Sequence, residues 1–280
     1  MRFYQNDSKF AEGSDQVLGS VADAGHEGFD MRIGTTIVAM AGVTAVASVL
    51  VMHAGPATAK NPADGITACA SGTRTQDPVL VVHGWHGPIQ GMTSDMEPIA
   101  AALQADGRCV YNLDYSSDLG PQTIVGQFTD AVHRILAVNS AQSISLVGHS
   151  EGGLIVRAVS MQFPAAANPV DKVVAISGPQ TGTGRLSGLS ADMTSYIAQL
   201  NSGPTPVAAS VNYTMVASRD DKISDPPTIG FVDASNVRNI WLQDGCPQDN
   251  SGHIEELKDS HLIGIVTNAL DPDQHPTIPC

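Results

Sequence analysis

The stretch Gly148-His149-Ser150-Glu151-Gly152-Gly153 follows an apolar run with β propensity at 143–147 and precedes a helical pattern at 154–159. A strand, then G-x-S-x-G, then a helix is the context in which this motif forms a nucleophile elbow. The turn holds the central serine in a strained conformation above the edge of a sheet, and a Cβ at the flanking glycines would collide with the neighbouring backbone. The motif alone is a weak signal, so its meaning depends on what surrounds it.

The segments around the elbow alternate between apolar runs and amphipathic patterns. The runs at 78–84, 109–115, 172–177, 210–217 and 237–242 are typical of strands buried on both faces. Helical spacing of apolar residues occurs at 94–105, 123–138 and 261–270. This order predicts an α/β-hydrolase type of α/β fold, with a mostly parallel, doubly wound sheet and helices on both faces. Functional residues are then expected in the loops that leave the C-terminal ends of the strands.

A serine nucleophile needs a general base, and the base needs an acid that orients it. In this fold the acid and then the histidine follow the serine along the chain. Asp220 and Asp221 follow the predicted strand at 210–217, and either could supply the acid. His253, His261 and His275 come later.

Among these histidines the local sequence favours His261. His275 lies in a proline-rich tail, and His253 lies in the polar stretch 249–253, where a solvated loop histidine is the more common outcome. His261 directly precedes an apolar helix, whose packing could hold the imidazole still. We therefore expect His261 to be the base.

An oxyanion hole needs two backbone N–H groups that point to the developing negative charge. One is expected from Glu151, the residue after the nucleophile. The loop after the first core strand, His83-Gly84-Trp85-His86-Gly87, should supply the other through Trp85. His83, His86 and His149 are expected to have structural roles.

The first 59 residues do not have the pattern of a folded domain. Residues 1–30 are polar, and a basic start at Met31-Arg32 precedes an uncharged apolar stretch that closes on Ala57-Thr58-Ala59. This organisation predicts an N-terminal extension and a signal peptide at 31–59, cleaved after Ala59, with a transmembrane anchor as the alternative. Residues 60–280 are expected to form a single catalytic domain, in a secreted protein.

Charge and cysteine content limit the partners. The formal net charge of −14 disfavours nucleic acid and anionic membrane surfaces. Four cysteines, Cys69, Cys109, Cys246 and Cys280, all follow the predicted cleavage site, so two disulfides are expected. Three pairings are open; the predicted strand positions favour Cys69 with Cys109, which leaves Cys246 with Cys280. No cysteine or histidine cluster has zinc spacing, and neither a metal nor a cofactor is expected.

The chain resembles secreted bacterial lipases and esterases of the class 2 type, in the α/β-hydrolase superfamily. The segments that carry the resemblance are 81–85, 111–115, 146–153, 213–223 and the closing stretch 236–272. The resemblance covers nearly all of 60–272. It implies that Ser150 is the nucleophile, that His261 is the base, and that Trp85 and Glu151 are the oxyanion donors. The family's acid is followed by a variable residue and an aliphatic one, which fits Asp221 better than Asp220. This chain lacks the additional cysteines that many members carry after the strand at 172–177.

The resemblance implies hydrolysis of carboxylic esters, in particular of lipids or acylglycerols, through an acyl-enzyme. Acyltransferase, thioesterase and amidase activities use the same machinery and stay open, as does a non-catalytic binding role. A monomer is expected, and a transient contact with a lipid interface is compatible with this interpretation. Residues 178–206 could form a lid whose apolar side chains line an acyl site, or an amphipathic helix packed on the body.

Overall fold

Six parallel strands form one sheet in the part of the chain that the computed structural model describes, residues 61–86, 92–185 and 191–280. The sequence-predicted strands are all confirmed, with these bounds: β1 Arg74–Val82, β2 Arg108–Leu113, β3 Ile144–His149, β4 Val170–Ile176, β5 Asn212–Ala217 and β6 Val237–Trp241. Their order across the sheet is β2-β1-β3-β4-β5-β6, and every neighbouring pair is parallel. The predicted fold class is therefore confirmed.

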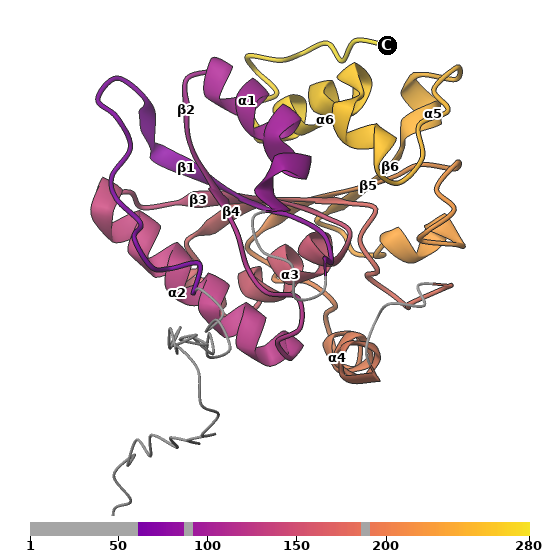
Figure 1. Cartoon of the computed structure of the whole chain (residues 1–280), viewed down its shortest axis with the longest axis horizontal. Helices are drawn as coiled ribbons and strands as arrows, with labels where there is room; N and C mark the ends of the chain where they lie inside the picture. The colour runs from indigo at the N-terminus through magenta and orange to yellow at the C-terminus, as the bar shows by residue number, and fades with distance from the viewer. Residues whose placement is uncertain (1–60, 87–91, 186–190) are drawn as a thin grey trace, which may run out of the picture. The chain divides into compact units, whose positions relative to one another are not determined.

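Helices cover both faces of this sheet. Their bounds are α1 Glu97–Ala105, α2 Pro121–Asn139, α3 Glu151–Ser160, α4 Ala191–Leu200, α5 Leu242–Gly245 and α6 Ser260–Leu270. Figure 1 shows α1 and α6 above the sheet and α2 and α3 below it. The expected helices at 94–105, 123–138 and 261–270 are present, although the first begins as a 3-10 turn at Met92–Met96.

Residues of the central strands alternate between two hydrophobic cores, which explains why these strands carry apolar residues on both faces. In β1, Leu80 and Val82 pack in the core that holds α2 and α3, whereas Val79 and Val81 pack in the core that holds α1 and α6. Because successive side chains of a strand point to opposite faces, a strand covered on both sides must be apolar at every position. Each of these four side chains is at most 1% exposed.

The strand order places a topological switch point at β1 and β3. The chain moves from β1 outward to β2, and then returns to the other side of β1 to form β3. The loops that leave the C-terminal ends of β1 and β3 therefore run in opposite directions and open a crevice between them. These are the loop that begins at His83 and the turn at Ser150, so the topology brings the predicted nucleophile next to the predicted oxyanion loop.

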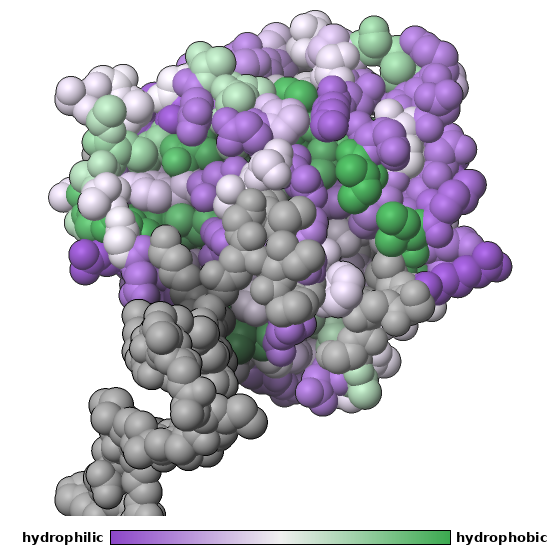
Figure 2. All heavy atoms as spheres, viewed as in Figure 1, coloured by the Kyte–Doolittle hydropathy of each residue, from purple (hydrophilic) through white to green (hydrophobic). Residues whose placement is uncertain are grey.

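Two disulfides are present, Cys69–Cys109 and Cys246–Cys280, which are the pairings that the strand positions favoured. The second ties the C-terminal tail to the segment that follows β6. The predicted signal peptide and its cleavage site lie outside the described residues. Among the described residues, no helix has the length and apolarity needed to cross a membrane. The face seen in Figure 2 is largely hydrophilic, in keeping with the high net charge, and its hydrophobic areas are small and separate.

Candidate active site

The elbow between β3 and α3 has the strained geometry that the sequence predicts. Ser150 has φ 54° and ψ −123°, a backbone conformation that L-residues rarely adopt, and its N–H donates to the carbonyl of Ile176 on β4. A Cβ on Gly148 would lie 2.2 Å from the carbonyl oxygen of Gly152, and one on Gly152 would lie 2.3 Å from that of Val82. Only glycine fits at either position, because backbone atoms cannot move aside as a flexible side chain can.

Asp221, which the resemblance favours as the acid, pairs with His253 and not with His261. Nδ1 of His253 lies 2.7 Å from Oδ2 of Asp221, and both side chains are buried. The other carboxylate oxygen, Oδ1, accepts the backbone N–H groups of Ile223 and Ser224, at 2.8 Å each. Asp221 is therefore held in place from both sides and can fix the tautomer and orientation of the His253 ring.

The electrostatics of this pair keep the carboxyl ionised. Burial alone would raise the pKa of Asp221, but the hydrogen bond and charge of His253 and the N–H donors of Ser224 and Ile223 outweigh burial and lower it. A carboxylate beside the ring stabilises the imidazolium that forms when the histidine accepts a proton.

The prediction that Asp221 orients His261 is wrong. His261 lies at the start of α6, where its Nδ1 is 2.5 Å from the carbonyl oxygen of Pro279 in the C-terminal tail. Its ring packs so closely on α5 that a Cβ on Gly245 would come within 2.7 Å of it. Packing does immobilise His261, as expected, but it holds the ring against the C-terminal tail. The loop that holds His253 is folded inward, which leaves His253 only 5% exposed and not solvated as expected.

A cavity of about 470 Å³ joins the elbow, the oxyanion loop and the His253 loop. Its lining includes Ser150 and His253 together with both predicted oxyanion residues, Trp85 and Glu151, but not His261. The described residues that complete the lining are Gly84, His86, Asp95, His149, Pro179, Arg185, Lys222, Ile223 and Ile254. Trp85, Ile223 and Ile254 are 46%, 45% and 43% exposed, so large apolar side chains lie at the mouth of the cavity.

The oxyanion loop is oriented by the side chain of His83. Nδ1 of His83 lies 2.7 Å from the carbonyl oxygen of Gly84 and donates to it. The Gly84 carbonyl and the Trp85 N–H belong to one planar trans peptide unit, so the direction of the first fixes the direction of the second. Burial lowers the pKa of His83, so that the ring is neutral. The expected structural role of His83 is thus specific: it sets the plane of the peptide that supplies the Trp85 amide.

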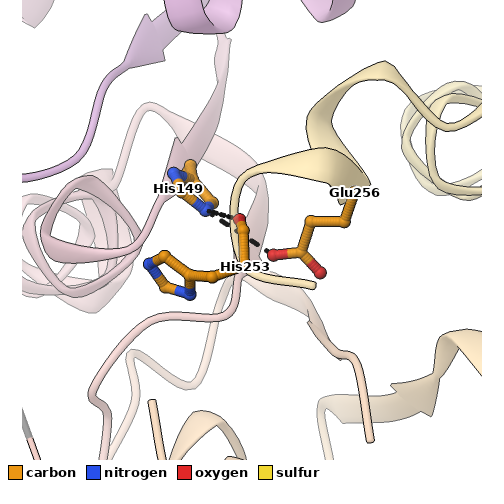
Figure 3. Close-up of side chains that lie close together, drawn as sticks. All are labelled: His149, His253 and Glu256. Atoms are coloured by element: carbon orange, nitrogen blue, oxygen red, sulfur yellow. Dashed lines mark hydrogen bonds and ion pairs between the residues drawn. The ribbon is translucent and has the colours of Figure 1, made fainter. Parts of the chain in front are cut away.

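His149 connects the elbow to the loop of His253. Its Nε2 lies 2.8 Å from the carbonyl oxygen of His253, and since a carbonyl only accepts, Nε2 carries the proton (Figure 3). Burial lowers the pKa of His149 to about 4, so it is neutral at physiological pH. The residue before the nucleophile therefore positions the backbone of the histidine that faces it across the cavity, which agrees with the expected packing role beneath the elbow.

Glu256 is a buried carboxyl beneath this contact, and the sequence reasoning missed it. Oε1 of Glu256 lies 3.6 Å from Nε2 of His149, and the side chain is fully buried (Figure 3). Donor atoms of His149, His253 and Glu256 lie within 4.8 Å of one another, a spacing that could hold a metal ion. However, Nδ1 of His253 already contacts Asp221 and Nε2 of His149 already donates to a carbonyl. The hydrogen bond from His149 to the His253 carbonyl is therefore better described as a support for the His253 loop, with the Glu256 carboxyl buried beside it.

Glu256→Gln is expected to flatten the dependence of stability on pH. Burial raises the pKa of Glu256 to about 8 in the folded protein, compared with about 4.5 when unfolded. The folded state therefore holds a proton that the unfolded state releases, and stability falls as the pH rises from about 4.5 to about 8. Glutamine cannot ionise, so the variant should gain stability relative to the parent over that range, by a few kcal/mol in order of magnitude at pH 8.

The measurement is the free energy of unfolding in urea at pH 5 and pH 8 for both proteins. Glu255→Gln, at an exposed neighbouring position, is the matched control and should leave the pH dependence unchanged. Parallel curves for the parent and Glu256→Gln would show that Glu256 does not carry the buried proton.

Within the segment 178–206, the described helix α4 packs on the body of the protein and does not line the cavity. Met193 and Ile197 of α4 pack on Leu154 of α3, and Tyr196 belongs to the core beneath the sheet. Met193, Tyr196 and Ile197 are all absent from the lining of the cavity. Leu186 and Leu189, two further apolar residues of this segment, lie outside the described residues.

A six-stranded parallel sheet with a strained serine elbow at its switch point, followed along the chain by an Asp–His pair, defines an α/β-hydrolase. A family model described as palmitoyl protein thioesterase matches residues 78–223, just over half of the chain. The chain belongs to this family. The matched region contains the oxyanion loop, the elbow and Asp221, and ends before His253.

Curated relatives are consistent with this assignment and with the resemblance to lipases and esterases. The chain is 34% identical over 114 residues to a triacylglycerol lipase of Pseudarthrobacter phenanthrenivorans, which covers 39% of this chain and 35% of that protein. It has the same identity over 114 residues to a triacylglycerol lipase of Burkholderia plantarii, covering 39% of this chain and 31% of the lipase. The matches thus span about a third of the length of these relatives.

Among solved structures, Aspergillus fumigatus lipase B superimposes with a TM-score of 0.59 at 20% sequence identity. The superposition covers 72% of this chain and 55% of that lipase. At this identity the likeness concerns the fold, and it confirms the α/β-hydrolase architecture.

Proposed function

We propose that this protein is a serine hydrolase that cleaves carboxylic esters of acyl groups, with Ser150, His253 and Asp221 as its catalytic triad. The observation that carries the proposal is the convergence of a strained Ser150 and an Asp221-bound His253 on one cavity. The order of the three along the chain is that of the fold class. His253 replaces His261 in the role that the sequence had suggested.

The reaction follows from these positions. His253 removes the proton of the Ser150 hydroxyl as the oxygen attacks the ester carbonyl, and Asp221 stabilises the imidazolium that results. The backbone N–H groups of Trp85 and Glu151 hold the oxyanion, the second at the N-terminus of α3, where the helix dipole favours negative charge. His253 returns the proton to the departing alcohol. Water then attacks the acyl-enzyme by the same route and releases the acid.

The substrates we propose are lipid or acylglycerol esters. Three exposed apolar side chains at the mouth of the cavity could contact an acyl chain or, transiently, a lipid interface. The lipase relatives support the same class of substrate. A monomer in solution is the assembly that we propose.

Hydrolysis of thioesters is the second candidate, because the matching family is described as palmitoyl protein thioesterase. The two candidates differ only in the leaving group, which departs as a thiolate in one case and requires a proton from His253 in the other.

A substrate panel separates these candidates. Initial rates are compared for p-nitrophenyl esters of increasing chain length, emulsified triacylglycerol and a palmitoyl thioester, each with the Ser150→Ala variant as the blank. Higher kcat/KM on oxygen esters supports the lipase or esterase assignment, and higher kcat/KM on the thioester supports the second candidate. Rates that Ser150→Ala retains in full on every substrate would rule out both.

We also propose that residues 60–280 form one catalytic domain that is exported after cleavage behind Ala59. Two disulfides support export, since such bonds persist in oxidising compartments. N-terminal sequencing of the protein from the culture medium of an expressing bacterium is expected to begin at Lys60. A start at or near Met1 would contradict the proposed signal peptide.

A further inference from the structure

The side chain of Glu151 lies in a buried cluster that the triad mechanism does not use. The residue is 1% exposed, and its Oε2 lies 2.8 Å from the hydroxyl of Tyr115. Its carboxyl also shares a hydrogen bond with the hydroxyl of Ser117. Tyr115 and Ser117 follow β2, so two hydroxyls from one loop converge on the carboxyl of the residue next to the nucleophile.

Each of these hydroxyls also contacts the oxyanion loop, one on either side of Trp85. The Tyr115 hydroxyl lies 3.2 Å from the carbonyl oxygen of His83. The Ser117 hydroxyl accepts the backbone N–H of His86 at 3.3 Å. Tyr115 is completely enclosed, with its ring stacked on His83 at a centroid distance of 4.4 Å. The cluster therefore fixes the backbone just before and just after the amide that Trp85 contributes.

We infer that the Glu151 carboxyl is a positioning group that, through Tyr115 and Ser117, holds the amides of Trp85 and Glu151 in register as a single oxyanion hole. This inference rests on the proposed function. Glu151 would supply one donor through its backbone and would align the other donor through its side chain.

The positioning role of Glu151 depends on pH, because ionisation of its carboxyl changes which group the Tyr115 hydroxyl donates to. A tyrosine hydroxyl can donate only one hydrogen bond. When Glu151 is neutral, its own proton goes to the Tyr115 oxygen, and the Tyr115 proton is free for the carbonyl of His83. When Glu151 is ionised, it has no proton to donate, and the Tyr115 proton turns to the carboxylate. The carbonyl of His83 then loses its donor, and a negative charge lies beside the site where the oxyanion forms.

The environment of the Glu151 carboxyl places its ionisation within the pH range of an ordinary assay. Burial raises the pKa of Glu151 to about 7, although the hydroxyls of Tyr115 and Ser117 lower it somewhat. The pKa of Tyr115 is raised well above its ordinary value by burial and by Glu151, so the phenol stays protonated. His83, which stacks on Tyr115, is kept neutral because burial lowers its pKa. The carboxylate of Asp114 lies 3.1 Å from Nε2 of His83 and also acts on Tyr115, so it is a second acidic group that faces the cluster.

The test compares the pH dependence of kcat and KM on p-nitrophenyl butyrate for the wild-type protein and Glu151→Gln. Glutamine can reproduce the hydrogen bonds of the neutral acid at every pH. The ratio of kcat at pH 9 to kcat at pH 6 is expected to be about three- to tenfold higher in Glu151→Gln than in the wild type, since loss of a whole oxyanion donor costs about 10²–10³ and a displaced donor costs less. KM should change little, because the oxyanion forms only in the transition state.

Two further variants distinguish alignment from a general effect of charge. Tyr115→Phe removes the link to His83 and should lower kcat already at pH 6; adding Glu151→Gln to it should cause little further change, because the two residues act through one contact. Glu97→Gln, at an exposed position on α1, is the control and should keep the wild-type ratio. Equal ratios in wild type and Glu151→Gln, in a wild-type protein that turns over ester, would overturn the inference alone. A wild-type protein that neither hydrolyses esters and thioesters nor reacts with a fluorophosphonate would overturn the proposed function and this inference with it.

Discussion

Ser150→Ala is expected to lower kcat on p-nitrophenyl butyrate by about 10⁴–10⁶, because the variant has no atom that can form the acyl-enzyme. The cavity, the oxyanion amides and the Asp221–His253 pair should be preserved, since the elbow is held by backbone contacts of Gly148 and Gly152. KM, where it can still be measured, should change much less than kcat. The rate is measured as nitrophenol release, with the variant purified apart from any wild-type enzyme.

The alanine variant needs a control for the strained turn. Thermal unfolding of Ser150→Ala should give a Tm close to that of the wild type, which would show that the fold survives. If a stable Ser150→Ala variant kept most of its activity, Ser150 could not be the nucleophile.

His253→Ala is expected to be nearly as severe as Ser150→Ala, whereas His261→Ala should keep most of the wild-type kcat. The two histidines lie eight positions apart and are both buried, but only His253 contacts Asp221 and lines the cavity with Ser150. Residues that act as one unit show similar losses when removed singly, so the loss for His253→Ala should again reach about 10⁴–10⁶.

The effect of His261→Ala should be on stability. Its ring contacts the C-terminal tail through Pro279 and fills space beside Gly245, so its removal leaves a cavity and an unpaired carbonyl. A lower Tm with a nearly unchanged kcat is the expected result at a temperature where the variant is folded. The reverse outcome, an active His253→Ala and an inactive but folded His261→Ala, would return the base to the position that the sequence first suggested.

The sequence predicted the fold because its signals are local. A strand buried on both faces must be apolar at each position, so β1, β3 and β4 could be located from composition alone. The elbow was recognisable because its motif is continuous in the chain: a Cβ on Gly148 would meet the backbone of Gly152 within the same turn. The clash at Gly152 is with the backbone of Val82 on β1 and becomes visible only in the fold. The chain order of the fold class then pointed to Asp220 and Asp221, and the pattern of the resembling family favoured Asp221.

The choice of histidine could not be made in this way, because it depends on where two loops go in three dimensions. The polar stretch 249–253 suggested solvent exposure, yet the loop turns inward and His149 binds its backbone from beneath. No local pattern near His253 encodes that contact, which joins positions 104 residues apart. The loop is held by the 3-10 turn that follows it, Glu255–Lys258, in which Glu256 and Leu257 are buried, and the sequence does not show that burial.

The side-chain cluster that supports the proposed oxyanion hole could not be predicted from the sequence either. Trp85 and Glu151 follow from their places after β1 and after the serine, and both line the cavity. The cluster of Tyr115 and Ser117 with the Glu151 side chain depends on the position of β2 beside β1, and thus on the sheet order. At the sequence level, Glu151 was considered only as a backbone donor.

The central claim is that Ser150 is a nucleophile activated by His253 and Asp221. Its most direct measurement is the site of covalent modification by a fluorophosphonate, determined by peptide mass spectrometry on the wild-type protein. We expect one adduct, on the peptide that contains Ser150, and its loss in Ser150→Ala and His253→Ala but not in His261→Ala. An adduct on any other residue, or labelling that persists unchanged in His253→Ala, would contradict it.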